Sequence, residues 1–219
     1  MKIFLDSANV AKIKEAADMG LCDGVTTNPT IIMKEGRDHK QVIQEICKII
    51  SGPVSVEGVG ETAEAMVKDA LEYSKWGKNV VAKVPMTKEG LKAVRILEAK
   101  GIPTNVTLVF SATQGLLAAK AGATFISPFV GRLDDISEDG MLLIADLVQM
   151  LGNYDYKAQV LVASVRHPVH VIQAAKLGAH VATLPPDVFD KMFNHPLTDK
   201  GVRQFTEDYN KAKASVAKK

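Results

Sequence analysis

The sequence is short of features that define several classes of protein. Its two cysteines, Cys22 and Cys47, are too few for a disulfide framework in a chain of 219 residues, so both are expected to be reduced. No apolar run reaches the roughly 18 residues that a membrane-spanning helix needs, and Asp6 interrupts the opening segment too early for a signal peptide. We therefore expect a cytoplasmic protein with no membrane partner.

An excess of charge of one sign is also missing. Lys and Arg number 27 against 25 Asp and Glu, which gives a formal net charge of +2, too small for the field with which a protein attracts nucleic acid. The basic residues 211–219 fit the carboxyl end of a helix, where the macrodipole favours cations. No nucleic-acid partner is expected, and the 47% hydrophobic content is that of a globular chain with a sizeable core.

Strand-like and helix-like segments alternate along the whole chain. The strand-like runs lie at about residues 2–6, 24–27, 53–58, 79–85, 104–109, 124–129, 159–164 and 180–184. Helical segments follow them, with a polar loop expected at about 34–40 and a helix at about 137–151. The alternation predicts an α/β protein, a single-domain (β/α)8 TIM barrel over residues 1–219 with a C-terminal helix at about 198–219. A doubly wound open sheet is the alternative, but no Gly-x-Gly-x-x-Gly turn follows any strand.

One lysine stands inside the apolar run at 79–85. The two-residue period of a strand puts Lys83 on the same face as Val81 and Pro85, and strands of a parallel sheet are buried on both faces. Burial disfavours a charged amine, and a neutral lysine can attack a carbonyl carbon to form a Schiff base. The alternative is an alkyl stem that lies along the surface and keeps its ammonium in water.

Polar residues end seven strands in succession. They are Asp6, Asn28, Glu57, Lys83, Asn105 with Thr107, Ser127, and Ser164 with Arg166. A single residue of this kind is equally typical of a helix cap or a solvated side chain. Because the active sites of barrel enzymes lie at the carboxyl ends of the strands, their joint occurrence around one lysine predicts an active site.

The residue types at these strand ends suit carbon–carbon bond cleavage. A Schiff base on Lys83 is an electron sink that makes the adjacent carbon–carbon bond breakable. Asp6 or Glu57 can then take a proton from a substrate hydroxyl, while the other carboxylate handles the water of imine formation.

Two arginines follow strands six and seven, where barrels commonly bind phosphate. Arg132 and Arg166, together with Ser164, can bind a phosphate group there. The alternative for each arginine is a surface ion pair, for which Asp134 and Asp135 are near Arg132 in the sequence. His167 and His170 can share a helix face, but no third ligand of matching spacing accompanies them, so no metal site is expected.

Four segments in this order resemble the transaldolase family, in its small subfamily that also contains fructose-6-phosphate aldolases. They read VTTNPT at 25–30, VAKVP at 81–85, TNVTLVFS at 104–111 and ISPFVGR at 126–132. The resemblance covers nearly the whole chain. It implies a cofactor-free transfer of a dihydroxyacetone unit from fructose 6-phosphate to an aldose phosphate.

The resemblance also implies a role for each matching position. Lys83 would form the Schiff base, Asp6 would be the general acid and base, and Glu57 with Thr107 would hold the catalytic water. The substrate-binding positions would be Asn28, Asn105, Ser127 and Phe129 for the dihydroxyacetone part, and Arg132, Ser164 and Arg166 for the phosphate.

Three of these positions distinguish the two activities within the subfamily. Aldolase members typically carry glutamine in place of Glu57 and tyrosine in place of Phe129, and lack Asn105, so the chain resembles the transaldolases. Fructose-6-phosphate aldolase and a sugar-phosphate-binding barrel without turnover are the alternative functions. A homo-oligomer, a pentamer or a decamer, is also implied, although the apolar stripe at Val202, Phe205 and Tyr209 can instead cover the chain's own barrel.

Overall fold

The computed structural model describes residues 1–216, which fold into eight strands and eleven helices. The strands are β1 (Lys2–Asp6), β2 (Gly24–Thr26), β3 (Val54–Glu57), β4 (Val80–Pro85), β5 (Thr104–Val109), β6 (Phe125–Pro128), β7 (Gln159–Val162) and β8 (Val181–Leu184). The helices are α1 (Val10–Asp18), α2 (Pro29–Glu35), α3 (His39–Ile49), α4 (Ala63–Tyr73), α5 (Lys88–Ala99), α6 (Ala112–Ala121), α7 (Val130–Asp134), α8 (Gly140–Asn153), α9 (Pro168–Lys176), α10 (Pro186–Lys191) and α11 (Pro196–Val216). A helix follows every strand, as the sequence predicts, and a second helix follows β2, β6 and β8.

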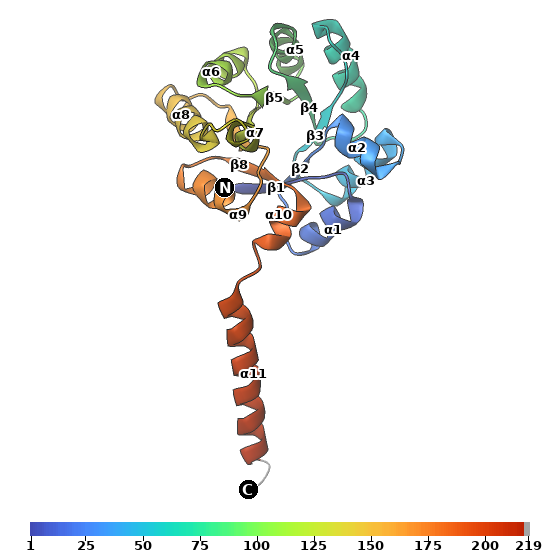
Figure 1. The fold of residues 1–219 in the computed structure, drawn as a ribbon. Coiled ribbons are helices and arrows are strands. Elements are labelled where there is room, and N and C mark those ends of the chain that lie inside the picture. The colour runs from blue at the N-terminus through green and yellow to red at the C-terminus, as the bar shows by residue number, and fades with distance from the viewer. Residues whose placement is uncertain (217–219) are drawn as a thin grey trace.

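The eight strands close into a barrel in sequence order. Every neighbouring pair is parallel, and β1 completes the ring by pairing with β8, Phe4 opposite Thr183. Helices surround the strands on the outside (Figure 1). The predicted (β/α)8 barrel is therefore confirmed, and the open sheet is wrong.

Two apolar layers follow from the alternation of side chains along each strand. Inside the barrel, Phe4 of β1 meets Phe125 of β6 edge to face, with ring centroids 6.1 Å apart. Because β1 and β6 are not neighbours in the sheet, these rings can meet only across the interior. On β4, Val81 belongs to this inner cluster, whereas Val80 and Val84 pack with the outer helices, so Lys83 faces inward.

Most helix boundaries follow the caps visible in the sequence. Thr87 caps α5 by accepting a hydrogen bond from Gly90 N at 2.9 Å, and Gly101 follows that helix with a φ of 74° that favours glycine. The loop expected at 34–40 is wrong in part, because α2 runs to Glu35. There Pro29 both ends the strand segment and occupies the first turn of a helix, which a proline tolerates well.

A second short helix, α7, which the sequence did not predict, follows β6 and includes Arg132. The following helix, α8, begins at Gly140 and not at about 137, because Asp139 caps it by accepting a hydrogen bond from Met141 N at 2.9 Å. Both differences lie at the mouth of the barrel, next to the candidate site.

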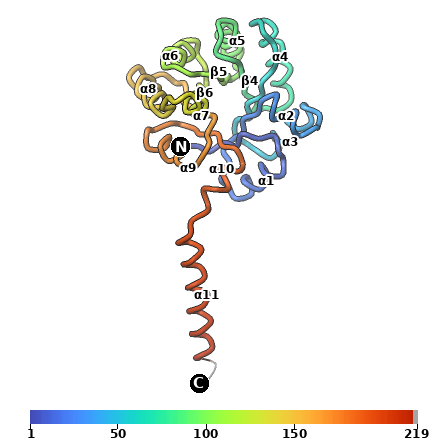
Figure 2. Tube along the Cα trace, viewed as in Figure 1, coloured from blue at the N-terminus to red at the C-terminus, as the bar shows by residue number. Residues whose placement is uncertain are grey.

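The C-terminal helix α11 extends away from the barrel (Figure 1), and the chain trace shows its whole length clear of the other helices (Figure 2). It has no buried residue, and the side chains of Phe205 and Tyr209 are 77% and 67% exposed. The alternative in which the apolar stripe covers the chain's own barrel is therefore wrong. The last positions of the expected helix, 217–219, lie outside the described residues. No helix among residues 1–216 combines the length and the apolar character needed to cross a membrane.

Candidate active site

A cavity of about 610 Å³ opens at the carboxyl ends of the strands. Ten of the eleven predicted site residues line it: Asp6, Asn28, Glu57, Lys83, Thr107, Ser127, Phe129, Arg132, Ser164 and Arg166. The eleventh, Asn105, is fully buried and contacts Ser127 from below. The structure therefore brings the predicted residues together at one mouth.

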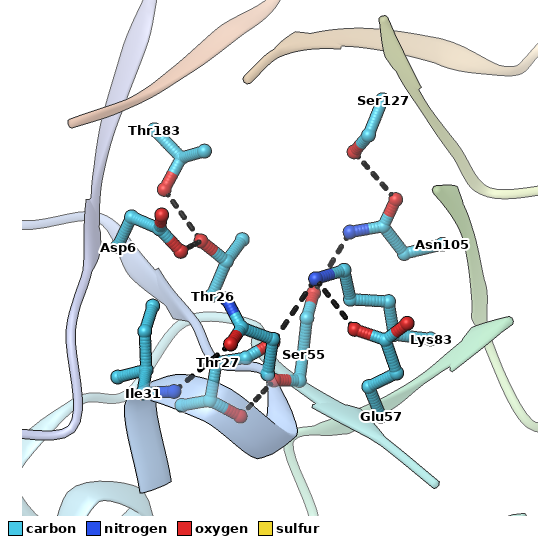
Figure 3. A network of polar contacts seen from close by, with 11 residues as sticks. Asp6, Thr26, Thr27, Ile31, Ser55, Glu57, Lys83, Asn105, Ser127 and Thr183 are labelled. Carbon is cyan, nitrogen blue, oxygen red and sulfur yellow. Dashed lines mark hydrogen bonds and ion pairs between the residues drawn. The ribbon is translucent and has the colours of Figure 1, made fainter. Parts of the chain in front are cut away.

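Lys83 projects from β4 into the barrel, and its side chain is only 6% exposed. Its Nζ lies 3.0 Å from Glu57 Oε2 and donates a hydrogen bond to the Thr27 carbonyl at 3.1 Å (Figure 3). The alternative in which the ammonium reaches bulk water is wrong. The apolar surroundings expected from the sequence are also incomplete, because a carboxylate and a carbonyl approach the amine directly.

Asp6 lies at the end of β1 and is held by a chain of hydroxyls (Figure 3). Thr26 Oγ1 donates to Asp6 Oδ1 at 2.8 Å, so the Thr183 hydroxyl, 2.7 Å from Thr26 Oγ1, donates to Thr26 in turn. Burial raises the pKa of Asp6 above its ordinary value, and this desolvation outweighs the attraction of Lys83 and the Thr26 hydrogen bond. A carboxylate of this kind is a stronger base than a solvated aspartate.

A chain of hydrogen bonds across three strands forms the floor of the cavity (Figure 3). Ser127 Oγ donates to Asn105 Oδ1 at 2.7 Å, and Asn105 Nδ2 donates to Ser55 Oγ at 3.1 Å. Asn28 has a different local role, because it caps α2 by accepting a hydrogen bond from Ile31 N at 2.9 Å. This cap uses Oδ1 and leaves the Nδ2 amide protons unused, and the residue lines the cavity.

Strand β5 is irregular where it meets the cavity. The register of β5 against β6 shifts between Val106 and Val109, and Leu108 has a φ of 60°, which is unusual for a residue with a branched side chain. Thr107 lies within this irregularity and is 1% exposed. Its Oγ1 is buried and has no hydrogen-bond partner among the described residues, so it has an unused donor and acceptor at the cavity wall.

The opposite wall carries the two arginines. Arg132, on α7, lies over the Phe129 ring with its guanidinium carbon 5.0 Å from the ring centroid, and it forms no ion pair within residues 1–216. Arg166 Nη2 pairs with Asp135 Oδ2 at 2.8 Å, and both side chains are more than half exposed. The ion-pair alternative therefore holds for Arg166 and fails for Arg132.

Close packing of the backbone sets the position of this wall. Ser164 has a φ of 58°, a left-handed conformation that is costly for a non-glycine residue and common at functional sites. Its carbonyl accepts a hydrogen bond from Gly131 N at 3.0 Å. A Cβ at Gly131 would lie 2.6 Å from Arg166 Nε and closer still to Ser164 O, so only glycine fits beneath Arg166.

Sequence reasoning missed several residues of the site. Thr26 and Thr183 orient Asp6, Ser55 holds Asn105, and Lys34 of α2 lines the cavity mouth. Thr183 lies within β8 and not at its end, so a search of strand ends does not find it. Thr26 stands one residue before the last expected position of its strand. Its place near a strand end was therefore the one sequence feature that could have indicated a role in the site.

No three His, Cys, Asp or Glu side chains in the described part of the chain are grouped as a metal ion's ligands would be. His167 and His170 do lie together, with ring centroids 3.9 Å apart, but His170 Nε2 contacts Asp134 Oδ2 at 2.8 Å.

The fold and the site define a (β/α)8 barrel with a buried lysine beside two carboxylates at its active-site mouth. A family model described as Transaldolase/Fructose-6-phosphate aldolase matches residues 3–216. The chain therefore belongs to the transaldolase/fructose-6-phosphate aldolase family of enzymes.

Curated relatives agree with this assignment, and a solved structure agrees with the fold. A probable transaldolase of Methanococcus maripaludis is 61% identical over 209 residues, which is 95% of this chain and 97% of the relative. Probable transaldolase 2 of Listeria monocytogenes is 58% identical over 95% of this chain and 96% of its own. A thiamine phosphate pyrophosphorylase of Pyrococcus furiosus has a TM-score of 0.57 over 84% of this chain and 85% of its own, at 16% identity, and shows a likeness of fold alone.

Proposed function

We propose that the protein is a transaldolase that acts through a Schiff base on Lys83. It transfers a dihydroxyacetone unit from fructose 6-phosphate or sedoheptulose 7-phosphate to an aldose phosphate, erythrose 4-phosphate or glyceraldehyde 3-phosphate. This reaction belongs to the non-oxidative pentose phosphate pathway. The observation that carries the proposal is the buried Lys83 amine in contact with Glu57, within a cavity that two arginines line on the other side.

Schiff-base formation begins when the Lys83 amine attacks C2 of fructose 6-phosphate. The ammonium first loses a proton, and the carbinolamine then loses its C2 hydroxyl as water to give a protonated imine. Glu57 is the nearest acid or base to Nζ, at 3.0 Å. The unpartnered Thr107 hydroxyl can bind the water that leaves and later returns.

Cleavage requires a base at the substrate's C4 hydroxyl, and Asp6 has this role. Its raised pKa favours proton uptake, and the Thr26 and Thr183 hydroxyls fix its orientation. As the proton moves to Asp6, the C3–C4 bond breaks, glyceraldehyde 3-phosphate departs, and the bonding electrons pass into the imine to give an enamine on Lys83.

The remaining polar residues bind the two ends of the donor. The amide of Asn28 hydrogen-bonds the dihydroxyacetone hydroxyls, and Asn105 with Ser127 forms the floor beneath them. Arg132, Ser164 and Arg166 bind the phosphate, for which Arg166 exchanges its exposed ion pair with Asp135.

The fate of the enamine distinguishes a transaldolase from an aldolase. Phe129 lines the cavity and offers no hydroxyl that could protonate the enamine or order water against it. The enamine therefore persists until a second aldehyde phosphate arrives. C3 of the enamine attacks that aldehyde carbon, Asp6 returns its proton to the new alkoxide, and hydrolysis of the imine frees Lys83.

Incubation with fructose 6-phosphate, with and without erythrose 4-phosphate, tests this proposal. We expect sedoheptulose 7-phosphate and glyceraldehyde 3-phosphate in the presence of the acceptor and little free dihydroxyacetone in its absence. Rapid release of dihydroxyacetone without acceptor would indicate a fructose-6-phosphate aldolase. Binding of fructose 6-phosphate without any turnover would indicate a sugar-phosphate-binding barrel.

We also propose that the chain forms a homo-oligomer, a pentamer or a decamer, in which α11 contacts a neighbouring subunit. The support is the exposed apolar stripe on α11, which includes Phe205 and Tyr209 and contacts no part of its own barrel. Light scattering should give the mass of five or ten chains for the wild type. Phe205→Glu combined with Tyr209→Glu should lower it, and a monomeric wild type would contradict the proposal.

A further inference from the structure

Behind the arginine wall lies a buried histidine that does not line the cavity. His170 is 4% exposed and belongs to the first turn of α9. Its two ring nitrogens contact two different segments. Nδ1 accepts a hydrogen bond from the backbone N–H of Arg166 at 3.3 Å, and Nε2 lies 2.8 Å from Asp134 Oδ2 at the end of α7.

These contacts define the protonation of the ring. Because Nδ1 accepts from a backbone N–H, it carries no proton, and Nε2 must then carry the proton that it donates to the Asp134 carboxylate. The second oxygen, Asp134 Oδ1, accepts from Gly140 N at 3.1 Å. Neutral His170 is thus a bridge with one acceptor and one donor, each used once.

The bridge joins the two segments that carry the arginines. Asp134 lies two residues beyond Arg132 on α7, and the other contact is to the backbone of Arg166 itself. The same segments also meet through the hydrogen bond from Gly131 N to Ser164 O. The exposed ion pair of Arg166 with Asp135 is a third link, but it uses the guanidinium that would bind a phosphate. With that ion pair exchanged for a phosphate, the separation of Arg132 and Arg166 is set by the packing of their backbones and by His170.

We propose that His170 is a positioning residue for phosphate recognition, which holds Arg132 and Arg166 at the spacing that a substrate phosphate requires. The inference rests on the proposed function for the identity of the substrate. The existence of an anion site does not depend on the proposed function, because the His170 bridge joins the two arginine segments whatever reaction follows. His170 itself touches neither substrate nor reacting atoms.

A proton on Nδ1 would break the bridge, because the nitrogen would then face the Arg166 N–H as a donor. Burial and the nearby His167 ring lower the pKa of His170, against the attraction of Asp134, and Arg166 acts in the same direction as His167. These three groups are the charged or titratable neighbours that act on the ring. The bridge is therefore intact at neutral pH and is lost as the pH falls through the lowered pKa.

Two substitutions separate positioning from general damage. His170→Leu fills the space but removes both the acceptor and the donor. His170→Gln keeps one acceptor and one donor and cannot take up a proton near neutral pH. His180→Leu is the matched control, because His180 Nδ1 also accepts from a backbone N–H, that of Val160 at 3.1 Å, just before β8 and at the opposite end of the barrel.

The experiment measures kcat and KM with fructose 6-phosphate and with unphosphorylated fructose, at a saturating concentration of erythrose 4-phosphate. We expect His170→Leu to raise KM for fructose 6-phosphate about tenfold, the effect of one misplaced charge-assisted contact, with kcat and the reaction of fructose nearly unchanged. His170→Gln should restore KM, and His180→Leu should leave it at the wild-type value. Equal losses with both sugars, or an unchanged KM in His170→Leu, would overturn the proposal.

Calorimetric titration with inorganic phosphate tests the bridge independently of turnover. The dissociation constant should rise about tenfold in His170→Leu and stay near the wild-type value in His170→Gln. If the wild type shows no transfer but this pattern holds, the proposed function fails and the positioning role stands. Equal phosphate affinity in all variants overturns the positioning role whatever the activity.

If His170→Leu does not fold, the positioning role is tested by comparing the pH dependence of phosphate binding in the wild type and in His170→Gln. Both enzymes experience the same titration of the phosphate itself, so any difference between their pH profiles comes from the ring. Phosphate affinity should fall more steeply in the wild type as the pH is lowered through the pKa of His170, which lies below its ordinary value. Superimposable profiles would contradict the proposal.

Discussion

Lys83 and Glu57 are partners in register on neighbouring strands, and their side chains meet with Nζ 3.0 Å from Oε2. The pairing is a direct consequence of the barrel, because Glu57, the last residue of β3, lies opposite Lys83 of β4 and both side chains face inward. An amine held in this way has an acceptor for its proton already in contact with it. The imine formation that we propose can therefore begin without a rearrangement of the site.

Asp6→Asn should nearly abolish transfer while leaving the site assembled. The amide oxygen still accepts from the Thr26 hydroxyl, but it cannot take the proton of the C4 hydroxyl, so kcat should fall by about 10²–10⁴-fold. Steady-state kinetics with fructose 6-phosphate and erythrose 4-phosphate checks this. A kcat within a few fold of the wild type would show that Asp6 is not the base.

Asp6→Asn should raise the stability of the fold at pH 7 while it lowers the activity. Burial raises the pKa of Asp6, so the folded state holds the carboxyl proton more tightly than the unfolded state. The stability contributed by the protonated form is present at low pH and is lost as the pH rises through the folded pKa. Asp6→Asn should thus unfold at a higher temperature than the wild type at pH 7, with a smaller difference at pH 4. A lower melting temperature at pH 7 would contradict this.

The eight strands and the position of Lys83 could be predicted because they depend on local patterns. Strands buried on both faces are near-continuous apolar runs, and a single lysine in such a run stands out. The same reasoning found Glu57 and Asp6, since the carboxyl ends of parallel strands meet at one mouth. This prediction succeeded because the order of the strands around the barrel equals their order in the chain.

Contacts between segments that are far apart in the sequence could not be predicted, because they depend on how the barrel closes and how its helices pack. Thr183 reaches Thr26 only because β8 closes against β1 and lies near β2, and nothing in the residues around Thr183 indicates this. The irregularity at Leu108 is also invisible to a two-residue period. The bridge made by His170 joins α9 to α7, two helices whose separation depends on the packing of α8 between them.

Thr107→Val tests whether the unpartnered hydroxyl binds the catalytic water. Valine has nearly the same shape, and no hydrogen bond within residues 1–216 is lost, so the melting temperature should hold or rise by the equivalent of about 1 kcal/mol. If the hydroxyl orders water for the imine, kcat should fall about 10²-fold. A variant with wild-type kcat would remove Thr107 from the mechanism.

Phe129→Tyr should raise the release of free dihydroxyacetone severalfold relative to transfer. Phe129 lines the cavity and packs edge to face on Phe110, with ring centroids 5.9 Å apart, so a hydroxyl can be added without loss of this contact. The new hydroxyl supplies the proton or ordered water that the enamine lacks. The ratio of the two products, measured with a fixed acceptor concentration, checks this, and an unchanged ratio would count against gating by Phe129.

Gly131→Ala should impair phosphate binding without touching the lysine. The added Cβ would overlap Ser164 O and lie 2.6 Å from Arg166 Nε, so the Arg166 side chain must move. KM for fructose 6-phosphate should rise about tenfold, the effect of one lost charge-assisted contact, and the reaction of unphosphorylated fructose should change little. Gly152→Ala is the control, because nothing lies within 4 Å of a Cβ at that position. Equal KM values in the two variants would contradict the assignment of this wall to phosphate.

Trapping of the covalent intermediate tests the central claim most directly. Reduction with borohydride in the presence of fructose 6-phosphate should fix a dihydroxyacetone-derived mass on the chain, and peptide mapping should place it at Lys83. Lys83→Met should show no such mass, whereas Lys34→Met, which changes another lysine at the cavity mouth, should be labelled like the wild type. Labelling at a lysine other than Lys83, or no labelling of an enzyme that still performs the transfer, would contradict the account.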